Sequence, residues 1–263
     1  MKKVMVVIPT YNERKNIEAL IPAILNVAPD FHVVVVDDNS PDGTGGFVED
    51  LGKKNSQIHV IRRRGKLGLG TAYIEGFKYA LRERADYIFQ MDADFSHDPR
   101  YMPDFIEKMS EYDVVLGSRY INGISVVNWD FKRLLLSKGA TKYVNMITGL
   151  GLTDTTGGFK CFRREAMVGI NLDKIRSTGY SFQIEMSFMT KEKGFRIGET
   201  PIIFVDRHVG TTKMSLGIAI EAVCMVWMLA GRRVIVPAWR VVMAVKQIFL
   251  ERIRLLRPVE VSS

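Results

Sequence analysis

Short apolar runs alternate with amphipathic segments along the first half of the chain. The apolar runs predict buried strands at 4–8, 32–36, 58–62, 87–91 and 113–116. The amphipathic segments predict helices at 12–27, 71–84 and 98–110. Strands that alternate with helices over short connections are typical of a parallel sheet covered on both faces. We therefore expect an α/β protein with a mostly parallel sheet.

The second half is less regular and ends in an apolar tail. Helices are expected at 131–147 and 180–191, and a strand is expected at 201–205. From residue 216 onward charges interrupt the apolar sequence, leaving no run of ~18 uncharged residues that could span a bilayer. We expect one domain over 1–215 and an amphipathic helical tail over 216–263. Such a tail suits a membrane interface, packing on the domain or self-association.

Acidic residues follow two of the predicted strands. Asp37 and Asp38 come after the second strand, and Asp92 and Asp94 come after the fourth. The carboxyl ends of parallel strands form the edge at which open α/β sheets bind ligands. Two carboxylates one residue apart can meet one hard divalent cation and leave positions for water and a diphosphate. The alternative is a pair of solvated acids that cap the next helix.

Two loops at the same edge have candidate ligand-binding residues. Thr10 and Glu13 have the spacing of a capping box, while Tyr11 and Glu13 are also placed to line a nucleotide crevice. The basic, Gly-rich loop at 62–70 matches neither a Walker A loop nor a dinucleotide fingerprint. It suits either an anion site at a helix N-terminus or a solvated loop.

Charge and composition limit the classes of binding partner and the compartment that we expect. The 263 residues include 37 Lys and Arg against 29 Asp and Glu, and this net charge of +8 favours anionic partners. Aromatic residues are not interleaved with the basic runs, so nucleic acid is not expected. Cys161 and Cys224 fit a reducing compartment, and the N-terminus has no signal-peptide pattern, which predicts a cytoplasmic protein. The four histidines have no metal-ligand spacing, and His97 and His208 are expected to be ordinary loop residues.

Several motifs together carry a family resemblance over about residues 1–215. They read PTYNE at 9–13, VDDNSPDGT at 36–44, QMDADFSH at 90–97, GSRY at 117–120, NW at 128–129, SKGA at 137–140, GFK at 158–160, GYSFQIE at 179–185 and FVDR at 204–207. This set resembles the family 2 GT-A glycosyltransferases, and within them the polyprenyl-phosphate (dolichyl-phosphate) mannosyltransferases. Ser96 departs from the pattern, since some relatives supply a longer Gln, and Thr212 stands where Ser is usual.

The resemblance implies a Rossmann-like GT-A fold and an inverting transfer of mannose. The donor would be GDP-mannose, the acceptor a polyprenyl (dolichyl-type) phosphate, and the product a polyprenyl β-mannosyl phosphate. Implied donor-binding residues are Pro9, Tyr11, Glu13, Val36, Asp38, Asp92, Ala93, Asp94, Arg207 and Lys213. Arg119 and Arg133 would bind the acceptor phosphate, and Asp92, Asp94 and Ser96 would hold Mg²⁺ or Mn²⁺. The implied catalytic residues are Asp94, Arg119, Arg133, Arg207 and Lys213.

Two alternatives stay open at this point. A glucosyl or amino-sugar transferase that uses a UDP-sugar would carry much the same motifs, because base and sugar choice depend on a few loop contacts. A silent nucleotide-sugar-binding or membrane-anchoring subunit would have no need of a metal site. In either transferase we expect peripheral attachment to the cytoplasmic face of a membrane, and the sequence leaves the oligomeric state open.

Overall fold

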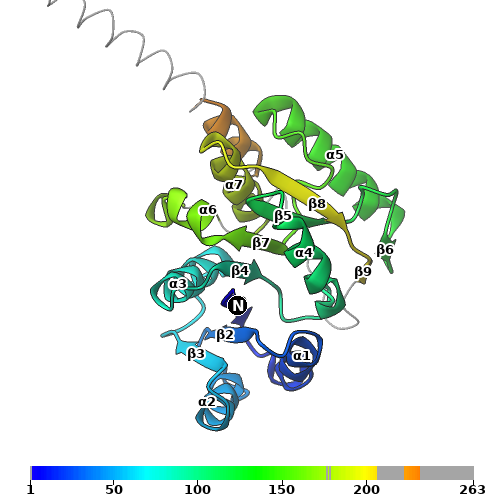
Figure 1. Ribbon diagram of the computed structural model, residues 1–263. Coiled ribbons are helices and arrows are strands. Elements are labelled where there is room, and N and C mark those ends of the chain that lie inside the picture. Colours follow the sequence, from blue (N-terminus) through cyan, green and yellow to red (C-terminus); the bar gives the residue numbers. More distant parts are fainter. Residues whose placement is uncertain (1, 176, 178, 206–221, 232–263) are drawn as a thin grey trace, which may run out of the picture.

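The computed structural model describes residues 2–175, 177, 179–205 and 222–231, and its main sheet has seven strands in the order β3-β2-β1-β4-β7-β5-β8 (Figure 1). They are β1 (Val4–Thr10), β2 (His32–Asp37), β3 (Ile58–Arg62), β4 (Tyr87–Gln90), β5 (Val114–Ser118), β7 (Lys160–Arg163) and β8 (Ile197–Pro201). Strand β7 runs antiparallel to β4 and β5, whereas the other pairs are parallel. The predicted mostly parallel α/β sheet is confirmed.

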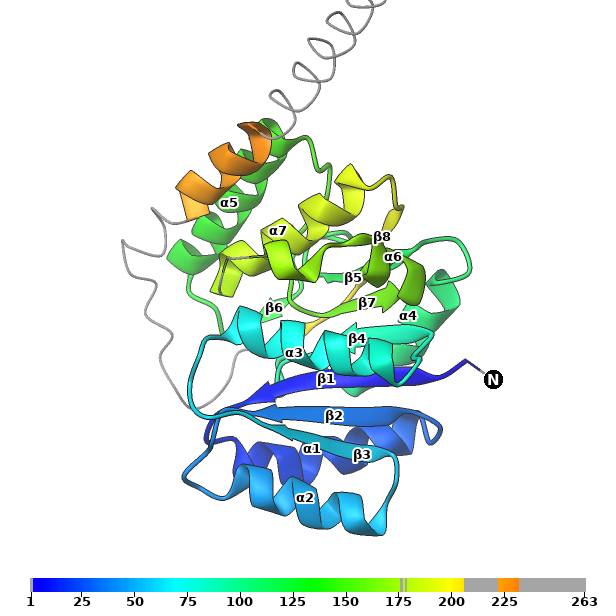
Figure 2. The ribbon, with the colours of Figure 1, turned by 90° about the vertical axis from the view of Figure 1, so that its left-hand side faces the viewer.

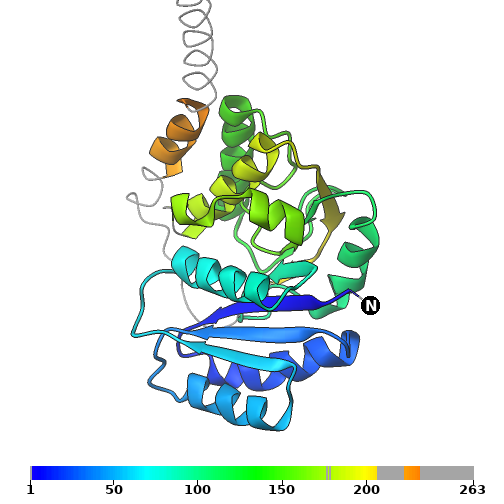
Figure 3. The ribbon, with the colours of Figure 1, turned by 60° about the vertical axis from the view of Figure 1, so that its left-hand side comes forward.

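Helices cover both faces of this sheet (Figure 3). One face carries α1 (Arg14–Val27), α2 (Thr44–Lys54), η1 (Pro99–Tyr101) and α4 (Met102–Lys108), and the other carries α3 (Leu69–Arg82), α6 (Arg164–Gly169), η2 (Leu172–Lys174) and α7 (Gly179–Glu192). Side chains alternate between the two cores along a strand. In β1, Val4 and Val6 therefore join the core under α1, while Met5 and Val7 join the core under α3.

Helix α5 (Phe131–Thr148) stands beyond one end of the sheet, and residues 222–231 form a helix beside it (Figure 2). Met225, Val226 and Leu229 of this helix are buried in the same core as Val144 of α5. The described part of the predicted tail thus packs on the domain, while the rest of the tail lies outside the described residues. No helix found among the described residues is long and apolar enough to cross a bilayer.

Two local expectations are wrong. Helix α1 begins at Arg14, with Glu13 as an N-cap that makes no capping bond, and Thr10 Oγ1 instead donates to Asp37 Oδ1 at 3.1 Å. The capping box fails because the helix begins after the proposed box. The strand expected at 201–205 divides into β8 and β9 (Phe204–Val205), which pairs with β6 (Val126–Val127). In β8 buried and partly exposed residues alternate, so the strand lacks the continuous apolar run used to find the others.

Candidate active site

The neighbouring strands β2, β1 and β4 bring the predicted acid clusters to one edge of the sheet. A cavity of about 270 Å³ opens there, which we call the edge cavity. It is lined by Pro9, Thr10, Tyr11, Glu13, Asp38, Lys66, Gly68, Leu69, Ala72, Asp92, Ala93 and Asp94. Most of the predicted donor-binding residues thus meet in one place. Among the described ones, Val36 does not line this cavity, and its side chain is fully buried in the core under α3.

The basic residues of the loop at 62–70 have different surroundings: one is buried in the fold, and another lines the edge cavity. The Arg63 side chain is 3% exposed, and its Nη1 lies 2.7 Å from Asp38 Oδ1. Burial raises the pKa of Asp38, and the Arg63 guanidinium opposes that shift. Lys66, by contrast, lines the cavity with its Nζ 4.6 Å from the centre of the Tyr11 ring. Arg63 therefore neutralises a buried acid, and Lys66 is placed to meet an anion in the cavity.

The two acids after β4 are held by their neighbours. Asp92 Oδ1 accepts a hydrogen bond from the buried Tyr73 hydroxyl at 2.5 Å, and the Asp92 N–H donates to His97 Nδ1 at 3.0 Å. Asp94 Oδ1 accepts from Ser96 Oγ at 2.6 Å and from the Ser96 N–H at 3.1 Å. Burial, followed by the charge of Asp92, raises the pKa of Tyr73 well above its usual range, so this phenol stays a donor.

His97 lies in a loop, as expected, but its side chain is buried. Its side chain is 2% exposed and stacks on Phe159, with ring centres 5.0 Å apart. Burial lowers the pKa of His97, and because Nδ1 accepts from Asp92, the proton of the neutral ring lies on Nε2. His97 and Tyr73 thus position Asp92. The sequence offered a signal only for His97, which ends the QMDADFSH motif, and none for Tyr73.

The oxygen atoms at this edge suit a hard divalent cation. Asp92, Asp94 and Ser96 offer carboxylate and hydroxyl oxygens, the donors that Mg²⁺ and Mn²⁺ prefer. No group of three or more His, Cys, Asp or Glu side chains in the described part of the chain could hold a metal ion by itself. Magnesium sites usually keep coordination positions for water and substrate phosphates. The donor set therefore fits a cation that shares its ligands with a bound diphosphate.

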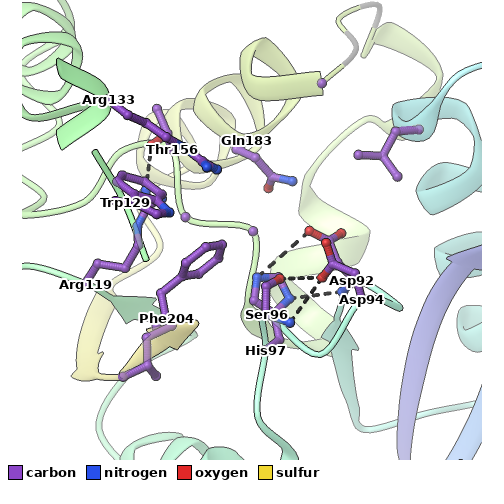
Figure 4. Close-up of a pocket in the computed structure, with 16 residues that line it drawn as sticks. Asp92, Asp94, Ser96, His97, Arg119, Trp129, Arg133, Thr156, Gln183 and Phe204 are labelled. Atoms are coloured by element: carbon purple, nitrogen blue, oxygen red, sulfur yellow. Dashed lines mark hydrogen bonds and ion pairs between the residues drawn. The ribbon is translucent and has the colours of Figure 1, made fainter. Parts of the chain in front are cut away.

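A second cavity of about 220 Å³, the central cavity, adjoins the first. Its lining includes Leu69, Asp92 and Asp94, which also line the edge cavity. Figure 4 shows its other wall, where Arg119, Trp129, Arg133, Thr156, Gln183 and Phe204 face the acids across the space. The predicted acceptor residues Arg119 and Arg133 thus share a cavity with the predicted metal ligands. Arg207 and Lys213 lie outside the described residues, so their predicted roles stay predictions.

The two arginines of this wall are held differently. Arg119 is 5% exposed, and its Nε and Nη2 donate to Asp154 Oδ2 and Oδ1, each at 2.6 Å. Arg133 is partly exposed near the start of α5, and its guanidinium lies 4.3 Å from the centre of the Trp129 ring. That ring also lies 5.2 Å from the Arg119 guanidinium. Trp129 therefore separates and orients two cations at the mouth of the central cavity.

A third cavity, the apolar groove, is the largest of these three at about 650 Å³. It runs between α5 and the helix at 222–231. Its lining comprises Arg119, Trp129, Lys132, Arg133, Leu135, Leu136, Ser137, Gly139, Ala140, Tyr143, Val144, Thr156, Ile184, Ala222, Val223 and Val226. Arg119, Trp129, Arg133 and Thr156 belong to the central cavity as well. The three cavities therefore form a continuous row that is acidic at one end and apolar at the other.

A buried polar network supports the floor of the central cavity. Lys160 is 1% exposed, and its Nζ donates to the Gln183 carbonyl at 2.8 Å and to Gln183 Oε1 at 3.1 Å. Gln90 Nε2 donates to the same Oε1 at 2.6 Å. Burial lowers the pKa of Lys160 to about 7, and the charge of Asp154 opposes this shift only in part. Sequence reasoning singled out neither Lys160 nor Gln183 for a role.

Replacing Lys160 with methionine should change how stability depends on pH. The unfolded chain keeps this lysine protonated up to its usual pKa of 10.5, whereas the folded protein releases the proton near pH 7. The free energy of unfolding of the wild type should therefore rise relative to Lys160→Met by up to about 1.4 kcal/mol per pH unit above pH 7. Urea unfolding at several pH values measures this, with Lys78→Met on the surface of α3 as the control. A difference that stays constant from pH 6 to 9 would contradict the lowered pKa of Lys160.

The order of the strands and the acid pair at their carboxyl edge define a Rossmann-like α/β protein with the GT-A fold. Residues 5–169 match the model of glycosyl transferase family 2, and the chain belongs to this family. It is 42% identical to the undecaprenyl-phosphate mannosyltransferase of Micrococcus luteus over 232 residues, which cover 88% of this chain and 96% of that one. It is 39% identical over 235 residues to the polyprenol monophosphomannose synthase of Mycolicibacterium smegmatis, covering 88% and 89%. The protein is accordingly a glycosyltransferase.

Solved structures of other proteins share the fold of this chain. One is the glucosyl-3-phosphoglycerate synthase of Mycobacterium tuberculosis in complex with Mn²⁺ and UDP-glucose, with a TM-score of 0.63 and 17% identity. The match covers 88% of this chain and 79% of that one. A likeness at this identity bears on architecture alone, and it confirms the GT-A fold expected from the motifs.

Proposed function

We propose that this chain transfers mannose from GDP-mannose to a polyprenyl phosphate, with inversion at the sugar carbon. The observation that carries the proposal is the row of three cavities. A nucleotide in the edge cavity places its sugar in the central cavity, beside the cations at the mouth of the apolar groove. An acceptor with an anionic head and a long apolar chain fits the other end of the row. The names of the two bacterial relatives support this acceptor class.

The chemistry needs positioning more than proton transfer. A phosphate monoester has a second pKa near ~6, so at neutral pH it is largely a dianion and already nucleophilic. The chain must then hold two anionic groups close together, which requires fixed cations. Arg133 and Arg119, ordered around Trp129, supply these on the acceptor side, and Lys66 supplies one beside the nucleotide. Direct displacement of the diphosphate gives the β-linked product.

Asp92, Asp94 and Ser96 would hold Mg²⁺ or Mn²⁺ on the donor side. Their oxygens suit either cation, and the M. tuberculosis synthase carries Mn²⁺ with its UDP-sugar. When bound, such an ion neutralises the charge that develops on the departing nucleoside diphosphate. Tyr73 and His97 keep Asp92 oriented, and Ser96 keeps Asp94 oriented.

The donor test is mass spectrometry of the lipid product. The full chain is incubated with a polyprenyl phosphate, Mg²⁺ and, in turn, GDP-mannose, UDP-glucose and a UDP-amino sugar. We expect a polyprenyl phosphohexose with GDP-mannose alone. A product made only from a UDP-sugar would support the alternative donor class, and no product with any donor would favour a silent binding subunit.

A substitution that fills the apolar groove tests whether the groove binds the lipid chain of the acceptor. Gly139 lines the groove within α5, and a Cβ at this position would meet nothing within 4 Å. Gly139→Leu should therefore leave the fold intact while filling apolar space that the lipid needs. We expect KM for a long-chain polyprenyl phosphate to rise about tenfold, equivalent to ~1.4 kcal/mol, with kcat nearly unchanged. Gly46→Leu in α2 is the matched control, since its Cβ also meets nothing within 4 Å. Equal KM values for the two variants would exclude the groove as the lipid site.

We also propose that α5 and the helix at 222–231 place the groove against a membrane surface. Phe131, Leu135 and Met146 of α5 are 75%, 63% and 73% exposed, and Trp227 is 59% exposed. Lysines on the same helix would meet anionic lipid headgroups. Co-sedimentation of the full chain with vesicles of anionic phospholipid tests this attachment. A chain that stays in the supernatant at low salt would contradict it.

A further inference from the structure

The amide nitrogen of Gln183 points into the central cavity. Gln183 lies on α7 and is 4% exposed, and it lines this cavity opposite the acids (Figure 4). Its Oε1 accepts two hydrogen bonds, from Gln90 Nε2 at 2.6 Å and from Lys160 Nζ at 3.1 Å. Among the described residues, none accepts a hydrogen bond from Gln183 Nε2. A nearly buried side chain thus offers a donor to whatever fills the cavity.

The orientation of this amide is fixed by Gln90, whose own orientation is set by a backbone carbonyl. Gln90 Nε2 also donates to the Gly158 carbonyl at 2.9 Å, and a carbonyl oxygen can only accept. Gln90 must therefore turn its NH₂ group toward both Gly158 and Gln183. Lys160 approaches the same Gln183 oxygen with an amine. A reversed Gln183 amide would place its NH₂ against the NH₂ of Gln90, so the nitrogen is turned toward the cavity.

An acceptor faces the same space as this donor. A Cβ added to Gly158 would lie 3.5 Å from Gln183 Nε2, 3.5 Å from Asp92 Oδ2 and 3.2 Å from His97 Cε1. The glycine therefore keeps open a small volume on which one amide donor and one carboxylate acceptor converge. A hydroxyl group both donates and accepts, so it matches this pair. Neither a phosphate dianion nor an apolar chain could donate a hydrogen bond to a carboxylate oxygen.

We propose that Gln183 binds the sugar of the nucleotide donor, with Nε2 donating to one hydroxyl oxygen of the hexose while Asp92 Oδ2 accepts the proton of that hydroxyl. The proposal rests on the proposed function, which places the sugar in the central cavity. Lys160 and Gln90 are positioning residues, because they act on the sugar only through the Gln183 amide. Sites built to hydrogen-bond a substrate hydroxyl discriminate strongly, since an unmatched buried donor is left unpaired.

The test compares binding of GDP-mannose with binding of GDP by titration calorimetry on the full chain with Mg²⁺, alongside transfer assays. Gln183→Glu keeps oxygens for Gln90 and Lys160 but loses the donor, and Gln183→Met loses the donor without adding charge. We expect both variants to bind GDP-mannose at least ~10-fold more weakly than wild type. GDP affinity should stay within twofold for Gln183→Met. Thr190→Val is the control, because this buried hydroxyl of α7 donates only to the Met186 carbonyl.

The outcomes separate this inference from the proposed function. If the Gln183→Met affinities for GDP and GDP-mannose fall equally, or neither changes, Gln183 has only a structural role and the inference is overturned. If the wild type binds GDP-mannose through Gln183 but forms no lipid product, the proposed function fails and the inference stands. If the wild type binds GDP-mannose no more tightly than GDP, the inference is overturned, while the lipid product alone decides the proposed function.

Discussion

Asp94→Asn is expected to lower kcat/KM for sugar transfer by at least about three orders of magnitude, or ~4 kcal/mol of transition-state stabilisation. Asparagine keeps an oxygen that can accept from Ser96, so the loop after β4 should hold its shape. It lacks the negative charge that a divalent cation requires, and the leaving diphosphate then departs without neutralisation. Steady-state transfer assays at saturating Mg²⁺ or Mn²⁺ measure the loss.

Removing the metal should have the same consequence for the unaltered chain. EDTA is expected to abolish transfer, and added Mg²⁺ or Mn²⁺ should restore it. Asp98→Asn is the matched control, since Asp98 follows in the same loop but its carboxylate binds Arg100 on the surface. Persistent turnover in EDTA, or equal losses of transfer activity in the two aspartate variants, would contradict the requirement for a divalent cation at Asp94.

Arg119→Ala is expected to destabilise the protein by about 3–5 kcal/mol, because it leaves a buried charge without its partner. Asp154 is 0% exposed, and Arg119 meets it with two hydrogen bonds in a side-by-side arrangement. Urea unfolding measures the loss. Arg133→Ala is the comparison, since Arg133 is partly exposed and packs on Trp129. It should change the free energy of unfolding by less than about 1 kcal/mol.

Transfer activity separates the structural and catalytic roles of these arginines. Arg133→Ala should lower kcat/KM by about 30-fold, equivalent to ~2 kcal/mol, through the loss of a charge-assisted contact with the acceptor. Replacing Arg119 and Asp154 together with leucine should recover much of the stability, because no buried charge remains unpaired. The double variant should nevertheless transfer little sugar if Arg119 also faces the acceptor. Full activity in a stable double variant would show that Arg119 serves the fold alone.

The features that were predicted correctly belong to short, continuous segments of the sequence. The apolar runs of β1 to β5 and the acids that follow β2 and β4 are properties of short segments, and parallel strands necessarily align their carboxyl ends. Fold class and the shared acidic edge could therefore be predicted from the sequence. The motifs also identified the family, which the match over residues 5–169 confirms.

Contacts that depend on burial could not be predicted, because burial is created by segments distant in the sequence. The loop at 62–70 suited either an anion site or a solvated loop, and nothing in it indicated the contact of Arg63 with Asp38, 25 positions away. His97 was expected to be a loop residue, and nothing indicated that Phe159 stacks on its ring. Val36 was implied for the donor pocket, and its side chain lies in the core under α3.

The sequence by itself determined the class of chemistry, because acids, glycines and basic residues keep their character wherever they lie. Tertiary structure alone decided which of them meet. Gln90 and Gln183 are 93 positions apart, and Arg119 and Asp154 are 35 apart, yet each pair makes a short, buried contact. The apolar groove likewise exists only because α5 and the helix at 222–231 pack side by side. Such pairings follow from the packing of the whole chain, which cannot be predicted from any short segment.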